Sequence, residues 1–140
     1  MTYASFNPFA IFVAAVVAFG LGYLWYVPLF GDTWARLSGH AGKSAAELEA
    51  LQAGAPKAYA ITFAAQLVMA AALTVLSDYF ALFTVVQALK LAVLVFFGFV
   101  GPVGLIATAH TGRPWMAWGI DAGYQLLYLV LMSLIIVLWL

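Results

Sequence analysis

The feature that most constrains this chain is a set of four long apolar runs that carry almost no charge. An α-helix needs about 20 apolar residues to cross a hydrocarbon core of about 30 Å, and only helices or closed barrels satisfy the backbone there. The sequence therefore predicts an all-α fold, a four-transmembrane-helix bundle that forms one integral membrane domain over 1–140. The expected spans are about 8–29, 58–77, 83–107 and 118–140.

The overall composition excludes several classes of protein. Of the 140 residues, 67% are hydrophobic and 7% are charged, which is too apolar a balance for a water-soluble domain of this size. The formal net charge of +0 creates no long-range field that would attract nucleic acid, so a nucleic-acid partner is not expected. The chain has no cysteine, which excludes disulfides and cysteine-ligated metals. No cofactor is indicated, and the partner that the composition predicts is the lipid bilayer.

The polar connection between the first two spans covers 31–56. Its Ser44 and Glu47 have the spacing of a capping box, in which each side chain bonds the backbone of the other residue. We expect a short interfacial helix to follow Ser44, to end at Gly54 and Pro56, and to lie along the membrane surface or under the bundle. A solvated loop is the alternative for so short a segment.

The distribution of positive charge predicts the orientation. Short loops rich in Lys and Arg stay on the cytoplasmic side of a membrane. The first connection is flanked by Arg36, Lys43 and Lys57, and the third contains Arg113. The termini and the second connection contribute only Lys90. Both termini are therefore expected outside the cytoplasm. Lys90 lies in the first turns of the third span, where its long stem can extend the charge to the headgroups.

Polar residues inside the spans are the first candidates for function, because they are costly in hydrocarbon. Asp121 lies about one turn inside the fourth span. Its structural interpretation is an ion pair with Arg36 or Arg113, and its functional alternative is a carboxylate that couples protons or binds a ligand. Gln66 and Gln125 are expected at similar depths, where their amides either bond each other between helices or contact a substrate.

The third span contains a predicted break. Pro102 lacks a backbone donor and leaves the Gly98 carbonyl without its helical partner, so a kink is expected. Broken helices line binding sites in transporters, whereas glycines spaced by three residues also allow helices to pack closely.

Two histidines, His40 and His110, make a poor metal site without a third ligand. The sequence has no nucleophile elbow, no HExxH and no phosphate-binding glycine loop, so an enzyme is not expected.

Several phrases of the sequence together resemble one known family. They are GYLWYVPLFGDTW at 22–34, KAY at 57–59, GRPW at 112–115 and IDAGY at 120–124. On these phrases the chain resembles the bacterial membrane family catalogued as domain of unknown function 1761, over nearly its whole length. The resemblance implies a small, four-helix, multi-pass protein of the bacterial inner membrane. It implies no established activity.

Two functions fit these observations. The first is a small transport or permeation unit that acts as an oligomer, because four helices of this length enclose little room for a substrate. Its ligand-binding side chains would line a hydrated cavity rather than bond only one another. These residues are Trp25, Tyr26, Gln66, Pro102, Asp121 and Gln125. The alternative is an accessory or scaffolding subunit of a larger membrane complex, with no chemistry of its own and with small-residue faces directed toward a protein partner.

Overall fold

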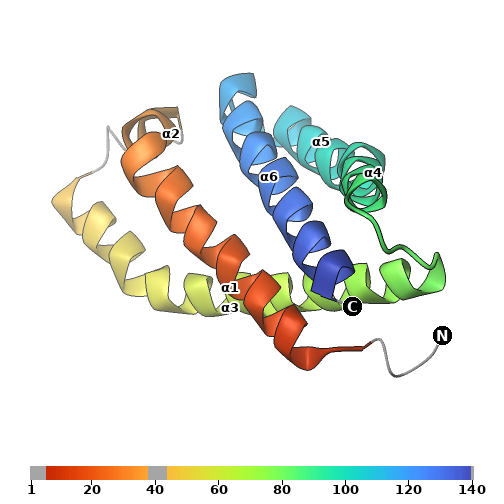
Figure 1. Ribbon diagram of the computed structural model, residues 1–140. Coiled ribbons are helices and arrows are strands. Elements are labelled where there is room, and N and C mark those ends of the chain that lie inside the picture. Colours follow the sequence, from red (N-terminus) through yellow and green to blue (C-terminus); the bar gives the residue numbers. More distant parts are fainter. Residues whose placement is uncertain (1–5, 38–43, 140) are drawn as a thin grey trace.

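The computed structural model describes residues 6–37 and 44–139, and every regular element in these ranges is helical (Figure 1). Four helical stretches are, by length and composition, able to cross a membrane. The predicted all-α fold with four spanning helices is therefore confirmed. In chain order the elements are α1 (Pro8–Leu24), the π-helical turn η2 (Trp25–Leu29), α2 (Gly31–Leu37), α3 (Ala45–Tyr79), α4 (Val85–Val95), the π-helical turn η4 (Phe96–Val100), α5 (Gly101–Thr111) and α6 (Trp115–Trp139). His40 and Lys43 lie outside the described residues.

Helix α6 is the centre of the bundle. It packs against α1, α3, α4 and α5. In its most apolar stretch 44% of the residues are buried, against 28% in each of the other three spanning helices. Figure 1 shows α1 and α6 side by side in opposite directions, with α3 running across them. The rings of Phe9 and Trp139 meet edge to face with centroids 5.4 Å apart, which places the start of α1 beside the end of α6.

Small residues on α1 make close packing against α6 possible. Ala14 and Ala18 are completely buried and belong to the same apolar cluster as Leu129, Met132 and Ile136 of α6. Lipid tails are as apolar as leucine, so helices in a membrane associate through close contact rather than through the hydrophobic effect. Alanines on one helix opposite larger side chains on the other supply that contact.

Helix α3 corrects the predicted structure of the first connection. It begins after Ser44, whose hydroxyl accepts a hydrogen bond from the backbone N–H of Glu47 at 3.2 Å, as the capping spacing predicts. The helix does not end at Gly54 or Pro56 but continues to Tyr79, so the prediction of a separate short helix there was wrong. Strong helix formers, mainly Ala, Leu, Glu and Lys, flank the proline on both sides and keep the backbone helical. The short helix in this connection is α2.

The length of α3 places part of it outside the hydrocarbon. A helix of 35 residues is about 50 Å long at a rise of about 1.5 Å per residue. A hydrocarbon core is only about 30 Å thick. Glu47, Glu49 and Lys57 all lie in the first half of the helix and are exposed. The polar part of α3 therefore extends beyond the membrane core.

Two spanning helices end at residues with a left-handed backbone. Helix α5 is followed by Gly112, with φ of 70°. Helix α3 is followed by Ala81, with φ of 51°. The backbone N–H of Ala81 donates to the carbonyl of Asp78 at 3.1 Å, and the next N–H, of Leu82, donates to that of Ser77 at 2.9 Å. This is the Schellman arrangement, in which glycine is usual because a Cβ is strained there.

Opposite substitutions at the two helix ends should change stability in opposite directions. We expect Ala81→Gly to raise the free energy of unfolding by about 0.5–1 kcal/mol, because the strain on the Cβ disappears. Gly112→Ala should lower that free energy by about 1 kcal/mol, because it introduces the same strain. Thermal unfolding of the purified protein in one detergent measures both changes. Shifts of the same sign in the two variants would contradict the left-handed geometry.

Candidate functional site

The turn η2 closes the first span and positions its last aromatic side chains. The backbone N–H of Phe30 donates to the carbonyl of Trp25, five residues back, at 2.9 Å. Pro28 lies inside this turn and has no N–H to give to a regular helical bond. A Cβ on Gly31 would stand 2.8 Å from the carbonyl oxygen of Tyr26, so the close approach requires glycine. Local geometry therefore explains why this segment carries both a proline and a glycine.

Asp121 on α6 is bonded through both of its carboxylate oxygens. Tyr26 Oη donates to Oδ1, and Arg113 Nη2 donates to Oδ2 at 2.8 Å. The side chains of Asp121 and Arg113 are 20% and 39% exposed, so the pair lies at the edge of the buried region. The ion pair predicted for Asp121 thus forms with Arg113. No ion pair involving Arg36 is present among the described residues.

Trp25 attaches η2 to the same part of α6. Its indole Nε1–H donates to the backbone carbonyl of Ile120 at 2.9 Å. The ring lies so close to α6 that a Cβ on Gly123 would stand only 3.0 Å from it. Trp25 and its neighbour Tyr26 therefore hold the end of α1 against the first turns of α6 with two side-chain hydrogen bonds.

A second set of hydrogen bonds lies deeper and joins three helices. Gln66 Nε2 on α3 donates to Tyr124 Oη on α6 at 2.9 Å, and the Tyr124 hydroxyl donates to the Ala18 carbonyl on α1 at 2.7 Å. Gln66 is only 4% exposed. Its Oε1 has no hydrogen-bond partner among the described residues. The Tyr124 hydroxyl is thus the point at which α1, α3 and α6 are fastened together.

The two sets of hydrogen bonds are neighbours. The rings of Tyr26 and Tyr124 meet edge to face with centroids 5.3 Å apart. We therefore treat Tyr26, Gln66, Arg113, Asp121 and Tyr124 as one polar network. From the sequence, Arg113 was predicted only as an ion-pair candidate, and Tyr124 was not predicted as a member of the site. A signal for Tyr124 was available, because it lies three residues after Asp121 and so occupies the same face of a helix.

The predicted pair between Gln66 and Gln125 does not form. Gln66 bonds Tyr124 instead, and the Gln125 side chain makes no hydrogen bond within the part of the chain that the structure describes. Consecutive residues of a helix point about 100° apart, so Tyr124 and Gln125 cannot both face α3. The depth of the two glutamines in the membrane was inferred from sequence position, but the direction in which each faces depends on how α6 is rotated in the bundle.

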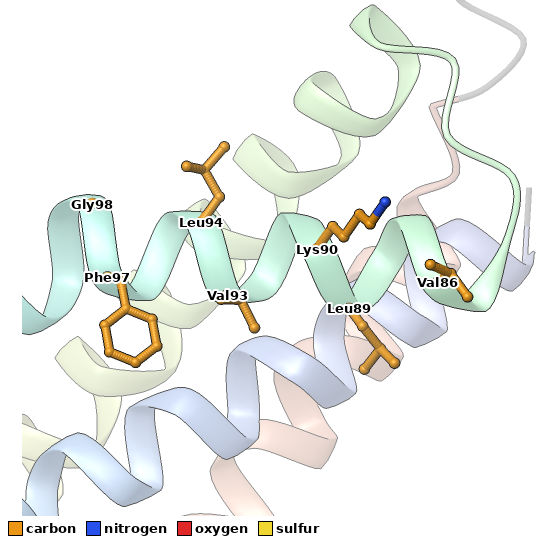
Figure 2. A pocket seen from close by; sticks show the side chains of 7 residues that line it. All are labelled: Val86, Leu89, Lys90, Val93, Leu94, Phe97 and Gly98. Atoms are coloured by element: carbon orange, nitrogen blue, oxygen red, sulfur yellow. The ribbon is translucent and has the colours of Figure 1, made fainter.

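The break in the third span takes the form of a π-helical turn rather than a proline kink alone. In η4 the backbone N–H of Gly101 donates to the carbonyl of Phe96, five residues back. Pro102 follows at the start of α5 and is exposed, whereas the hydrogen bonds of the polar network come from other elements. Gly98 is also exposed and lines a shallow apolar groove along α4, which Figure 2 shows from nearby. The Pro102 break therefore belongs to a different surface from the polar network.

The described residues contain no cluster of metal-ligating side chains. In residues 6–37 and 44–139, no group of three or more His, Asp or Glu side chains is arranged to hold a metal ion. Five further polar side chains have a buried N or O atom that lacks a hydrogen-bond partner in the same ranges. They are Ser77, Asp78, Thr108, Trp118 and Ser133.

The comparisons with known proteins decide the family. A family model described as "Protein of unknown function (DUF1761)" matches residues 9–137. The chain belongs to this family. The matched range includes the whole polar network, both π-helical turns and all four spanning helices except the first residue of α1 and the last ones of α6. Comparison with curated proteins and with solved structures found no match. The description of the DUF1761 family states no activity.

Two tyrosines on α6 provide a matched test of the polar network. We expect Tyr124→Phe to lower the free energy of unfolding by about 1–2 kcal/mol, because it removes two hydrogen bonds and leaves the buried Gln66 amide unpaired. Tyr128→Phe one turn away should cost less than about 0.5 kcal/mol, because this hydroxyl reaches only the Met69 sulfur, at 3.7 Å. Chemical unfolding of both variants in the same detergent gives the comparison. Equal losses would show that Tyr124 has no special role.

Proposed function

We propose that this DUF1761 protein is an accessory or scaffolding subunit of a larger membrane complex, with no chemistry of its own. One observation carries the proposal. The side chains of the polar network and of Trp25 direct their hydrogen bonds to one another and to the backbone of neighbouring helices. A transport site requires polar side chains that stay available to a substrate and water. A network that fastens α1, α3 and α6 together serves instead to hold the shape of a small bundle.

An exposed surface on α3 supports the same proposal. Four small or medium residues recur at every fourth position and face outward, away from the core. They are Ala60, Ala64, Val68 and Ala72, which we call the α3 ridge. Small residues at this spacing allow a second spanning helix to approach closely, and such close packing drives association in membranes. The α3 ridge is thus the surface on which we place the partner.

The proposal includes an orientation in the bacterial inner membrane, with both termini outside the cytoplasm. It rests on positive charge. Helix α2, which contains Arg36, and the start of α6, which follows Arg113, lie at the same end of the bundle in Figure 1. Lys57 lies in the polar half of α3. Lys and Arg near span ends favour the cytoplasmic side. The polar network would accordingly lie in the cytoplasmic half of the membrane.

A transport or permeation unit formed by several copies is the second candidate function. It is favoured by the partial exposure of Asp121 and Arg113 and by the unpartnered Oε1 of Gln66. In this alternative, Trp25, Tyr26 and Asp121 would line a path that an assembly of copies completes. The two candidates differ in what accompanies the chain in the membrane.

The decisive experiment extracts the tagged protein in native lipid particles and identifies its partners by mass spectrometry that preserves non-covalent contacts. We expect stoichiometric recovery of a larger membrane protein with the wild type. Ala64→Trp on the α3 ridge should reduce that recovery at least tenfold, because the bulky ring prevents close helix packing. Val103→Trp, at an exposed position of α5, is the matched control and should leave recovery unchanged.

One outcome would overturn the accessory role, and another would overturn its docking surface. Recovery of homo-oligomers without another subunit, together with a solute flux that Asp121→Asn abolishes, would establish the transport alternative. Equal partner recovery with Ala64→Trp and Val103→Trp would remove the α3 ridge as the docking surface.

A further inference from the structure

A shallow apolar groove runs along the outer face of α4 and the π-helical turn η4, on the opposite side from the residues that pack into the bundle. Seven residues between Val86 and Gly98 line it, and we call it the α4 groove (Figure 2). They recur at intervals of three and four residues, so they occupy one face of the helix. Leu94 and Phe97 are 65% and 66% exposed. A Cβ on Gly98 would meet nothing within 4 Å, so the end of the groove is open.

Lys90 is the one charged residue in this groove. It is exposed, and the structure gives it no ion pair within residues 6–37 and 44–139. It lies five residues after the start of α4, which corresponds to about 8 Å along the helix. A cation at this depth requires an anion or water at the headgroup level. The α4 groove therefore combines the positive charge of Lys90 with an apolar surface that continues deeper into the membrane.

This combination matches the two parts of a lipid. We propose that the α4 groove binds one anionic phospholipid, with Lys90 contacting the headgroup phosphate and an acyl chain lying along Leu94 and Phe97 toward Gly98. The charge complements the phosphate, and the exposed side chains offer the acyl chain an apolar surface. A lipid of zwitterionic character brings its own ammonium group, which competes with the lysine, so the site should prefer a net negative headgroup.

A second copy of the chain is a poorer occupant than a lipid. A helix docked here would need a free carboxylate opposite Lys90. The chain has five acidic residues. Three of them, Asp32, Glu47 and Glu49, belong to α2 and the start of α3, which are joined by the first connection, whereas α4 begins after the second. Asp121 is already paired with Arg113, and Asp78 is only partly exposed, with one carboxylate oxygen buried. No exposed carboxylate of the described residues suits this position.

The proposal is tested with the whole protein in vesicles that contain equal amounts of phosphatidylglycerol and phosphatidylethanolamine. Mass spectrometry after gentle release counts the lipids that stay bound. We expect the wild type to retain one phosphatidylglycerol per chain in at least tenfold preference to phosphatidylethanolamine. Lys90→Gln should abolish the preference and Lys90→Arg should preserve it. Lys57→Gln, which removes an exposed charge from α3, is the control and should behave as the wild type.

A second variant tests the acyl-chain part of the groove. Gly98→Leu places a side chain in the open end and should lower phosphatidylglycerol retention at least fivefold, while Lys90 is left in place. Thermal unfolding in detergent verifies that each variant is folded, and Lys90→Arg repeats the readout without loss of charge. Unchanged preference in Lys90→Gln would overturn the proposal. So would a wild-type protein that carries no preferred lipid, or one whose α4 groove is covered by a protein partner in native lipid particles.

Discussion

A carboxylate inside a membrane-spanning helix needs hydrogen-bond partners that hydrocarbon does not supply, and the packing of α1 on α6 follows from how Asp121 obtains them. Tyr26 bonds one carboxylate oxygen from the end of α1, and Arg113 bonds the other from just before α6. The first span ends at Tyr26 and its neighbours in a π-helical turn rather than a regular one, because Pro28 has no N–H to donate. Beside Asp121, Gly123 leaves room for the Trp25 ring, which a Cβ at this position would approach to 3.0 Å.

Hydropathy and charge were enough to predict the helical spans, because length and composition alone decide what crosses a membrane. They were not enough at Pro56, where the helix formers on both sides outweigh one lost hydrogen bond. Asp121 was recognised as costly from its type and depth. Its partner Arg113 was one of two alternatives, since sequence position does not say which cation reaches it. The Gln66 partner was mistaken for Gln125 because rotation of a helix about its axis depends on packing.

The residues that stabilise the bundle are separate from the surfaces that we propose for contacts with other molecules. The polar network lies within the bundle and fastens three helices at their common meeting point. The α3 ridge and the α4 groove face outward from different helices. The α3 ridge consists of small or medium side chains, whereas the α4 groove is apolar and carries a single positive charge. A protein partner on one face and a bound lipid on the other are compatible with each other. A small subunit of this kind would contribute packing to an assembly while its polar network stabilises its own fold.

We infer that Asp121 acts as a structural cross-link, and a double-mutant cycle measures this coupling. The free energy of unfolding is measured for Arg113→Gln, Asp121→Asn and the double variant in one detergent. Because the Arg113 side chain is 39% exposed, we expect a coupling energy of only about 0.5–1 kcal/mol. The same cycle with Arg36→Gln should give about zero. A coupling of zero between Arg113 and Asp121, or an equal coupling with Arg36, would contradict the cross-link.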